Sequence, residues 1–280
     1  MALHFLPHGP ALVVENTLRV LVIADLHIGI ESDLDTHGIH IPSQGRGRLD
    51  RVLACIAEGR PDLVLLLGDV KHSVPLTSRQ EYYEIPGLLQ EIRSRAPLKV
   101  APGNHDGGIE RFLQEGELLP MKGALIDGVG YLHGHTYPDP ALLGHLLVIG
   151  HHHPMVSLRD EVGCALRDRA YLLTSVDEGC LGIAGEGKGV EKGAAGGATG
   201  KTARSREMKR SGREYYPGNG NPCPTRILVM PAFNEFTGFD LTGMKESGLG
   251  PLSKCMDFPN AEVFLTDGTY LGLLGSLAGE

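Results

Sequence analysis

Side chains that can bind metal ions occur in five clusters along the chain, each directly after a short apolar run. The clusters are Asp25-Leu26-His27, Gly68-Asp69, Gly103-Asn104-His105-Asp106, His133-Gly134-His135 and Gly150-His151-His152-His153-Pro154. Carboxylate, amide carbonyl and imidazole groups together suit Mn²⁺, iron or Zn²⁺ better than Ca²⁺ or Mg²⁺. Histidine can also act as an acid or a base. The clusters therefore predict a metal centre with a proton donor close by.

Each cluster has a simpler interpretation when it is taken singly. A short polar group such as Gly68-Asp69 is typical of a turn at the end of a strand. The glycine and three polar residues at 103–106 and the three adjacent histidines at 151–153 are harder to explain in this way. Buried imidazolium groups are costly unless they bind metal or pair with another group. Five signals in this order favour one shared site over five unrelated turns.

The apolar runs before the clusters have the length and composition of buried strands. They cover residues 19–24, 62–67, 98–101, 131–132 and 146–149. Between the first two runs, apolar residues recur at helical spacing from Leu49 to Ile56, and Gly59 and Pro61 end the pattern. A strand, a helix and a strand in sequence predict a parallel sheet, in which sites form beyond the carboxyl ends of the strands.

The rest of the chain is predicted in less detail. Residues 78–95 have a helical pattern that Pro86-Gly87 should break or kink. Residues 184–221 are rich in Gly, Ala and charged residues and are expected to form a flexible insertion in a single domain spanning 1–280. A strand is expected at 226–230, and a hairpin at 261–266 and 270–274 with its turn at Asp267-Gly268.

Charge limits the kinds of partner. The chain has 280 residues and a formal net charge of −8 at pH 7, which argues against a surface that binds nucleic acid all over. Residues 201–213 carry six basic residues and one acidic residue, and we interpret them as a solvated loop in preference to a nucleic-acid contact. Residues 195–202 nearly match a phosphate-binding loop, but the first Gly and a preceding strand are missing.

The cysteines and the N-terminal residues indicate where in the cell the protein is expected to be. The five cysteines, at 55, 164, 180, 223 and 255, are odd in number and far apart, so we expect neither a disulfide framework nor a cysteine-ligated zinc site. Unpaired thiols of this kind are typical of the reducing cytoplasm. Residues 1–10 do not have the pattern of a signal peptide, and no apolar run is long enough to cross a membrane. We therefore expect a cytoplasmic protein with no membrane partner.

In their order and spacing, the five clusters resemble the motifs of calcineurin-like metallophosphoesterases. More narrowly, they are similar to those of archaeal phosphoesterases related to the exonuclease subunit SbcD and of bacterial ligase-associated phosphoesterases. Residues 19–154 carry the resemblance, which resumes weakly at Met230-Pro231-Ala232-Phe233. The resemblance implies a four-layer α/β/β/α sandwich with two mixed β-sheets.

The resemblance also implies a role for each matching residue. One divalent metal ion would be held by Asp25, His27, Asp69 and His153, and a second by Asp69, Asn104, His133 and His151. Manganese is the first expectation, with iron, zinc or nickel as alternatives. His105 matches the histidine that protonates the leaving oxygen. Many members have a second Asp at the position of His72 here, where it orients that histidine, so this part of the proton relay departs from the family pattern.

The implied reaction is hydrolysis of a phosphoester by in-line attack of a metal-bridging hydroxide. A phosphodiester in a nucleotide or nucleic acid is favoured, which would suit a nuclease with DNA-processing partner proteins; a phosphomonoesterase, a non-catalytic scaffold and a regulatory metal-binding protein are the alternatives. Five further residues are expected beside the ligands or the substrate: Lys71, His72, Asp106, His135 and His152. For Lys71 a solvated side chain is favoured over a phosphate contact.

Overall fold

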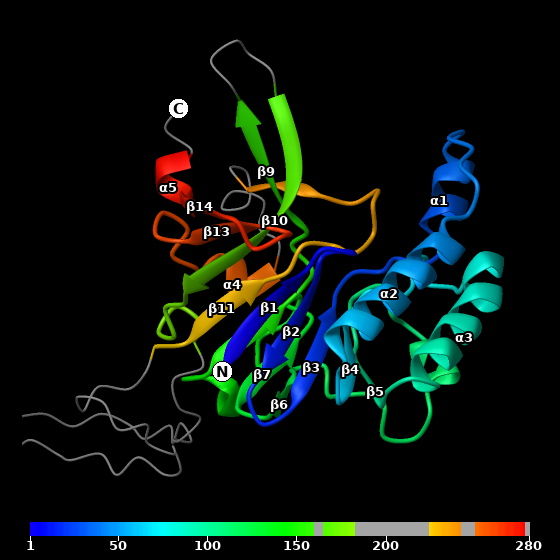
Figure 1. The fold of residues 1–280 in the computed structure, drawn as a ribbon, viewed down its shortest axis with the longest axis horizontal. Coiled ribbons are helices and arrows are strands. Elements are labelled where there is room, and N and C mark those ends of the chain that lie inside the picture. Colours follow the sequence, from blue (N-terminus) through cyan, green and yellow to red (C-terminus); the bar gives the residue numbers. More distant parts are fainter. Residues whose placement is uncertain (160–164, 183–223, 242–249, 278–280) are drawn as a thin grey trace, which may run out of the picture.

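The computed structural model describes residues 1–159, 165–182, 224–241 and 250–277, which form two facing β-sheets flanked by helices (Figure 1). The first sheet has the order β1-β2-β3-β4-β5. Its strands are β1 (Ala2–Leu6), β2 (Ala11–Glu15), β3 (Arg19–Ile23), β4 (Leu63–Leu67) and β5 (Leu98–Ala101). The pairs β3–β4 and β4–β5 are parallel, whereas β1 and β2 add antiparallel strands at one edge.

The second sheet has the order β12-β9-β10-β11-β8-β7-β6, with β13 and β14 attached through β10. Its strands are β6 (Ala124–Ile126), β7 (Val129–Leu132), β8 (Leu146–Ile149), β9 (Pro154–Arg159), β10 (Ala165–Ser175), β11 (Arg226–Val229), β12 (Phe239–Asp240), β13 (Glu262–Leu265) and β14 (Tyr270–Leu273). The pairs β7–β8 and β8–β11 are parallel, and β6–β7 and β10–β11 are antiparallel. Both sheets are therefore mixed, as the family resemblance implied.

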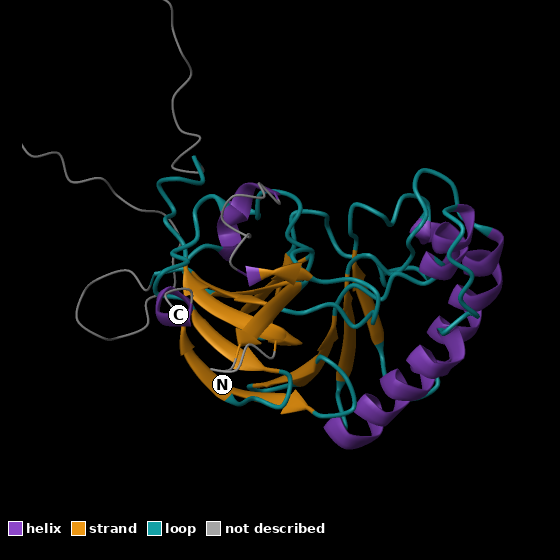
Figure 2. Cartoon of the chain, turned by 90° about the horizontal axis from the view of Figure 1, so that it is seen from above, coloured by secondary structure: helices purple, strands orange, loops and turns teal. Residues whose placement is uncertain are grey.

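The helices complete the outer layers. They are α1 (Ile30–Thr36), α2 (Gly45–Gly59), α3 (Arg79–Arg93), α4 (Gly250–Ser253) and α5 (Leu274–Leu277), with short 3₁₀ turns η1 (Ile109–Phe112) and η2 (Pro140–Leu142). Figure 2 shows the long helices on one flank of the strands. In the described part of the chain, no helix is both long and apolar enough to cross a membrane.

Alternating side chains of β3 show how the layers pack. Leu21 and Ile23 belong to the core between the first sheet and the helices α2 and α3. Val20 and Val22 point to the opposite face and pack with residues of the second sheet such as Tyr131. Because successive residues of a strand face opposite sides, an apolar strand of this kind must be covered on both faces. A further core lies between the second sheet and α4 and α5, which completes four layers.

Most of the predicted elements are confirmed. The five apolar runs are β3, β4, β5, β7 and β8, and the helical pattern from Leu49 to Ile56 lies within α2. The strand expected at 226–230 is β11, and the expected hairpin is formed by β13 and β14. The expected insertion, the phosphate-loop-like segment and the basic run, between 184 and 221, lie outside the described residues.

Of the break or kink expected at Pro86-Gly87, the break is wrong, because α3 runs without interruption from Arg79 to Arg93. A capping box supports its start: Ser78 accepts the N–H of Glu81, and the Glu81 side chain accepts the N–H of Ser78. Pro86 is exposed, and the carbonyl left without a helix donor belongs to Tyr82, which is also exposed. Water can therefore bond to that carbonyl, which lowers the cost of an internal proline.

The expectation of unpaired cysteines is also wrong, because Cys180 and Cys255 form a disulfide across 75 residues of sequence. Cys180 follows β10 and Cys255 follows α4, so the two meet only when the second sheet and its outer layer have packed. Sequence spacing could not show this proximity. Cys55 is a buried free thiol, while Cys164 and Cys223 lie outside the described residues.

We expect the double variant C180S/C255S to lose about 2–4 kcal/mol of unfolding free energy, because a cross-link over a long loop restricts the unfolded chain. Urea denaturation with and without dithiothreitol measures the effect. The double variant serves as the control, since reductant should not change its stability further. Alkylation of Cys180 and Cys255 in native, unreduced protein would contradict the prediction.

Candidate metal centre

The predicted clusters meet where the carboxyl ends of five strands converge. Asp25 follows β3, Asp69 follows β4 and Asn104 follows β5, and these three strands are parallel neighbours. In the second sheet His133 follows β7 and His151 follows β8, which are also parallel neighbours. Since the strand ends of each sheet share one edge, packing the two sheets together brings both sets of side chains to a common point.

His133 lies at the centre of the place where the two sets of side chains meet, and it is fully buried. Its Nδ1–H donates to the carbonyl of Leu67 at 2.9 Å, because a carbonyl oxygen can only accept. Its Nε2 therefore faces the other way, 3.3 Å from Asp69 Oδ2 and 3.3 Å from Asn104 Oδ1. An imidazole nitrogen, a carboxylate and an amide carbonyl facing one another form a site suited to a cation.

A second group of ligands adjoins the first. Asp25, His27, Asp69 and His153 each place one ligand atom within 4.8 Å of the others, as do Asp69, His133 and His151. The Nε2 atoms of His27 and His153 are buried without a hydrogen-bond partner, although they lie 3.7 Å from Asp69 Oδ2 and 3.2 Å from Asp25 Oδ1 respectively. Buried nitrogens that face carboxylates without bonding to them fit a metal site. Asp69 belongs to both groups.

The protonation states also suit metal binding. Burial lowers the pKa of His27 and of His151 to about 3, so both rings are neutral. Burial raises the pKa of Asp69, but His133 and other neighbours outweigh it and lower the pKa below its usual value. Burial lowers the pKa of His133 as well, but Asp69 and Asp25 raise it to about 9. A cation would have to displace the extra proton of His133, whereas His27, His151 and the Asp69 carboxylate are already in the protonation state that binds metal.

The backbone around the site is unusual. Non-glycine residues rarely adopt positive φ, and such strain concentrates at functional sites. Of the seven non-glycine residues with positive φ in the described chain, five belong to the clusters: Asp25 at 56°, His27 at 43°, Asp69 at 47°, His151 at 68° and His153 at 45°. Gly103 is needed for lack of space and not for its φ angle. A Cβ at this position would lie 2.1 Å from Asp69 Oδ1, so any side chain would collide with Asp69.

His105 is placed beside the metal-binding clusters. Its backbone N–H donates to Asp69 Oδ1 at 2.8 Å, and its Nδ1–H donates to the carbonyl of His72. Asp106 is buried and accepts from the backbone N–H groups of Gly103 and Lys71. Burial and then the charge of Asp69 raise the pKa of Asp106 to about 6. Asp106 therefore supports the loop that carries Asn104 and His105.

The remaining candidates lie around this centre. Lys71 is not solvated as expected, because its side chain is fully buried and donates to the carbonyl of Ser73. His152 is buried and donates from Nδ1 to the carbonyl of Gly150 at 3.1 Å. The half-buried ring of His135 lies 5.2 Å from that of His133. Burial lowers the pKa of both His135 and His152 to about 4.

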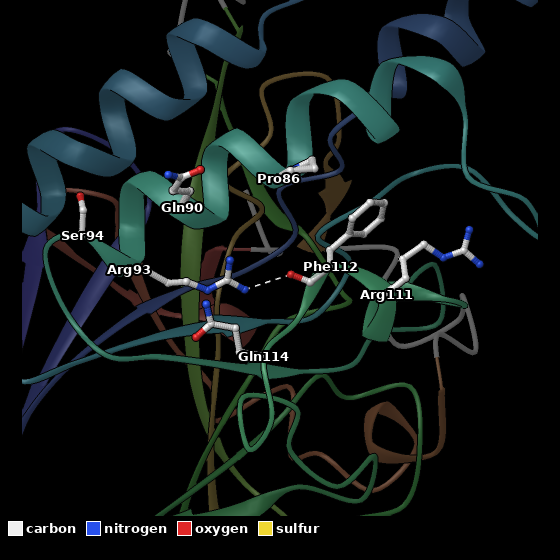
Figure 3. Close-up of a pocket in the computed structure, with 7 residues that line it drawn as sticks. All are labelled: Pro86, Gln90, Arg93, Ser94, Arg111, Phe112 and Gln114. Atoms are coloured by element: carbon white, nitrogen blue, oxygen red, sulfur yellow. Dashed lines mark hydrogen bonds between the residues drawn. The ribbon is translucent and has the colours of Figure 1, made fainter.

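A hollow of about 300 Å³ opens onto the centre. Its lining residues are Asp69, Asn104, His105, His151, His152, His153, Gly238 and Phe239. A larger hollow of about 590 Å³ lies between α3 and residues 111–114, where Arg93 donates to the carbonyl of Phe112 at 3.0 Å (Figure 3). None of the residues lining the larger hollow belongs to the five clusters, so the smaller one is the candidate site.

Two residues of this site were not predicted from the sequence. Asn234, fully buried, donates from its side chain to the carbonyl of Leu26 at 3.1 Å, and its backbone N–H donates to the carbonyl of Asp25. It therefore holds the turn that carries Asp25 and His27. Phe239 lines the hollow, and its N–H donates to the carbonyl of His153 at 2.8 Å. Asn234 follows β11 as the other site residues follow their strands, so the same signal could have identified it.

The family model for calcineurin-like phosphoesterases matches residues 18–171. A Danio rerio transmembrane protein with a metallophosphoesterase domain is 31% identical over 91 residues, which cover 32% of this chain and 17% of that protein. The chain thus aligns with about a sixth of the length of that curated relative.

Two solved structures are similar in part. The Pseudomonas putida nuclease MPE is 15% identical, with 92% of this chain and 97% of that chain covered and a TM-score of 0.49. Yfce, a phosphoesterase from E. coli, is 20% identical over 50% of this chain and 73% of that chain, with a TM-score of 0.33. The family match covers more than half of the chain and includes strands of both sheets, so the chain belongs to the calcineurin-like phosphoesterase family.

Proposed function

We propose that this protein is a hydrolase that uses two divalent metal ions to cleave phosphodiesters. One ion would be held by Asp25, His27, Asp69 and His153, and the other by Asp69, Asn104, His133 and His151. The observation that carries the proposal is the position of Asp69, which is 2% exposed and belongs to both ligand groups. A carboxylate shared between two groups of ligands can bridge two metal ions held a few ångströms apart, the arrangement of a two-metal site.

Bound cations would activate a water molecule and stabilise the charge on the phosphoryl oxygens. The chain itself would supply the proton for the leaving group. His105 lines the hollow, and its Nδ1–H is fixed on the carbonyl of His72, so its Nε2 is the nitrogen left to hold and donate a proton.

The choice of a phosphodiester rests on the similarity of the motifs to those of SbcD-related and ligase-associated phosphoesterases. A nucleotide or a nucleic acid is accordingly the proposed substrate, manganese is the proposed metal, and DNA-processing proteins are the proposed partners. The complete set of ligand positions, together with His105, which metal binding does not need, argues against a scaffold that has lost catalysis.

We expect chelator-stripped protein to hydrolyse bis-p-nitrophenyl phosphate only after Mn²⁺ is added. Mn²⁺ at about 100 times its dissociation constant should also stabilise the fold by about 2.7 kcal/mol, because it binds the folded state. Absorbance of the released nitrophenolate and a thermal melt measure the two effects. Folded protein without turnover under any divalent metal would exclude a diesterase, and the monoester p-nitrophenyl phosphate would then separate a monoesterase from a scaffold.

A further inference from the structure

The side chain of His72 faces the candidate ligand His27. Its Nδ1 lies 3.2 Å from His27 Nδ1, and the two rings meet edge to face with centroids 5.2 Å apart. On the opposite side, His72 Nε2 lies 3.6 Å from Oδ2 of Asp33 on α1. Asp33, His72 and His27 therefore form a continuous chain of polar groups that ends at the candidate metal centre.

One arrangement of protons satisfies this chain. His27 Nε2 is buried, faces Asp69 and needs its lone pair to bind a metal ion. The proton of the neutral ring is then on Nδ1, which donates it to His72 Nδ1. Since His72 Nδ1 accepts, the proton of His72 is on Nε2, the atom that faces the Asp33 carboxylate. Each nitrogen thus has the role that its neighbour requires.

We propose that His72 is a positioning residue that holds His27 in the tautomer and orientation needed to bind metal, with Asp33 fixing the tautomer of His72. The inference rests on the proposed metal centre and adds residues that ligate no ion themselves. Histidine ligands commonly donate their second N–H to a partner that orients the ring. The main chain of His72 has a separate task, because its carbonyl accepts the Nδ1–H of His105.

A third metal ion is the competing explanation, since one nitrogen from each of His27, His72 and His105 also lies within 4.8 Å of the others. Three features favour the positioning role. His105 Nδ1 already donates to the carbonyl of His72. His27 would have to bind metal through both nitrogens and lose both protons. The group also contains no carboxylate to balance the charge of an ion.

The variants H72A, H72N and H72Q test the inference through the affinity for Mn²⁺, measured by isothermal titration calorimetry on chelator-stripped protein. We expect H72A to weaken one Mn²⁺ site by about 10- to 100-fold, while its backbone still offers His105 a carbonyl. H72N should restore most of the affinity, because its Oδ1 can accept where Nδ1 did. H72Q places its amide oxygen near the position of Nε2 and should not restore it.

D33N should weaken the same site by a smaller factor, and D35N, on the same helix and paired with His40, should have no effect. The melting temperature of each metal-free variant shows that it is folded. Unchanged Mn²⁺ affinity in H72A overturns the inference, as does a folded H72N that fails to restore it. Three Mn²⁺ ions per wild-type chain would favour the third ion. Wild-type protein that binds no Mn²⁺ would overturn the proposed function itself.

Discussion

Replacing Asp69 by Asn should lower kcat/KM for bis-p-nitrophenyl phosphate by about 10³-fold, because each 1.4 kcal/mol of lost transition-state stabilisation is a factor of ten and a metal ion supplies several kcal/mol. Asp69 Oδ2 faces both His133 and His27, and it is the only carboxylate that the two described ligand groups share. The variant should therefore bind fewer than two Mn²⁺ ions per chain, as counted by metal analysis after gel filtration.

Asparagine is a mild replacement at this position. It tolerates the positive φ of 47° that Asp69 adopts, so the backbone should stay in place and the charge should be the main loss. D127N is the matched control, because Asp127 also has positive φ, at 50°, and accepts from the N–H of Leu18 far from the clusters. If D69N kept two Mn²⁺ ions and near-normal turnover, Asp69 would not bridge a two-metal site.

Replacing His105 by Ala should have an effect that depends on the leaving group. For a dinucleotide, whose leaving alkoxide needs a proton, we expect turnover to fall by about 10²- to 10⁴-fold, the usual contribution of a general acid. For bis-p-nitrophenyl phosphate the loss should be much smaller, since nitrophenolate is a stable anion. Mn²⁺ content should not change, because His105 belongs to neither of the two proposed ligand sets. Steady-state rates on both substrates measure the difference.

H40A provides the control for loss of a histidine, because His40 is exposed and pairs only with Asp35 among the described ion pairs. The leaving-group dependence separates a proton donor from a residue that merely shapes the hollow. An equal loss on both substrates would assign the His105 side chain to substrate binding, since the Ala variant keeps the backbone N–H that Asp69 Oδ1 accepts.

Local patterns were sufficient to predict the parts of this protein that depend on neighbouring residues. The apolar run before Asp69 is β4 because five consecutive aliphatic residues can be buried on both faces of a sheet. The helical spacing from Leu49 to Ile56 marks α2 for a similar reason, since one apolar face must pack on that sheet. The metal-binding residue types follow these strands directly, so the predicted site depends only on the rule that parallel strands end together.

Local patterns are not sufficient where the structure depends on exposure to solvent or on residues distant in the sequence. Pro86 does not end α3, because the carbonyl that it leaves free is on the exposed side of the helix. Lys71 is buried and donates to the carbonyl of Ser73, although lysine after a strand is usually solvated. Neither the exposure of that carbonyl nor the burial of Lys71 can be predicted from the few residues next to it in the sequence.

The sequence by itself determined the class of the site and named its candidate ligands by residue type and position. The tertiary structure decided how those residues act on one another. Only the packing of the two sheets puts Asp69 between His133 and His27. Only the return of the chain after β11 puts Asn234 against the turn of Asp25, and only the fold joins Cys180 to Cys255. The orientation of His72 toward His27, with Asp33 behind it, belongs to the same group. These contacts join segments far apart in the chain, and their energies arise from burial and packing that exist only in the folded state.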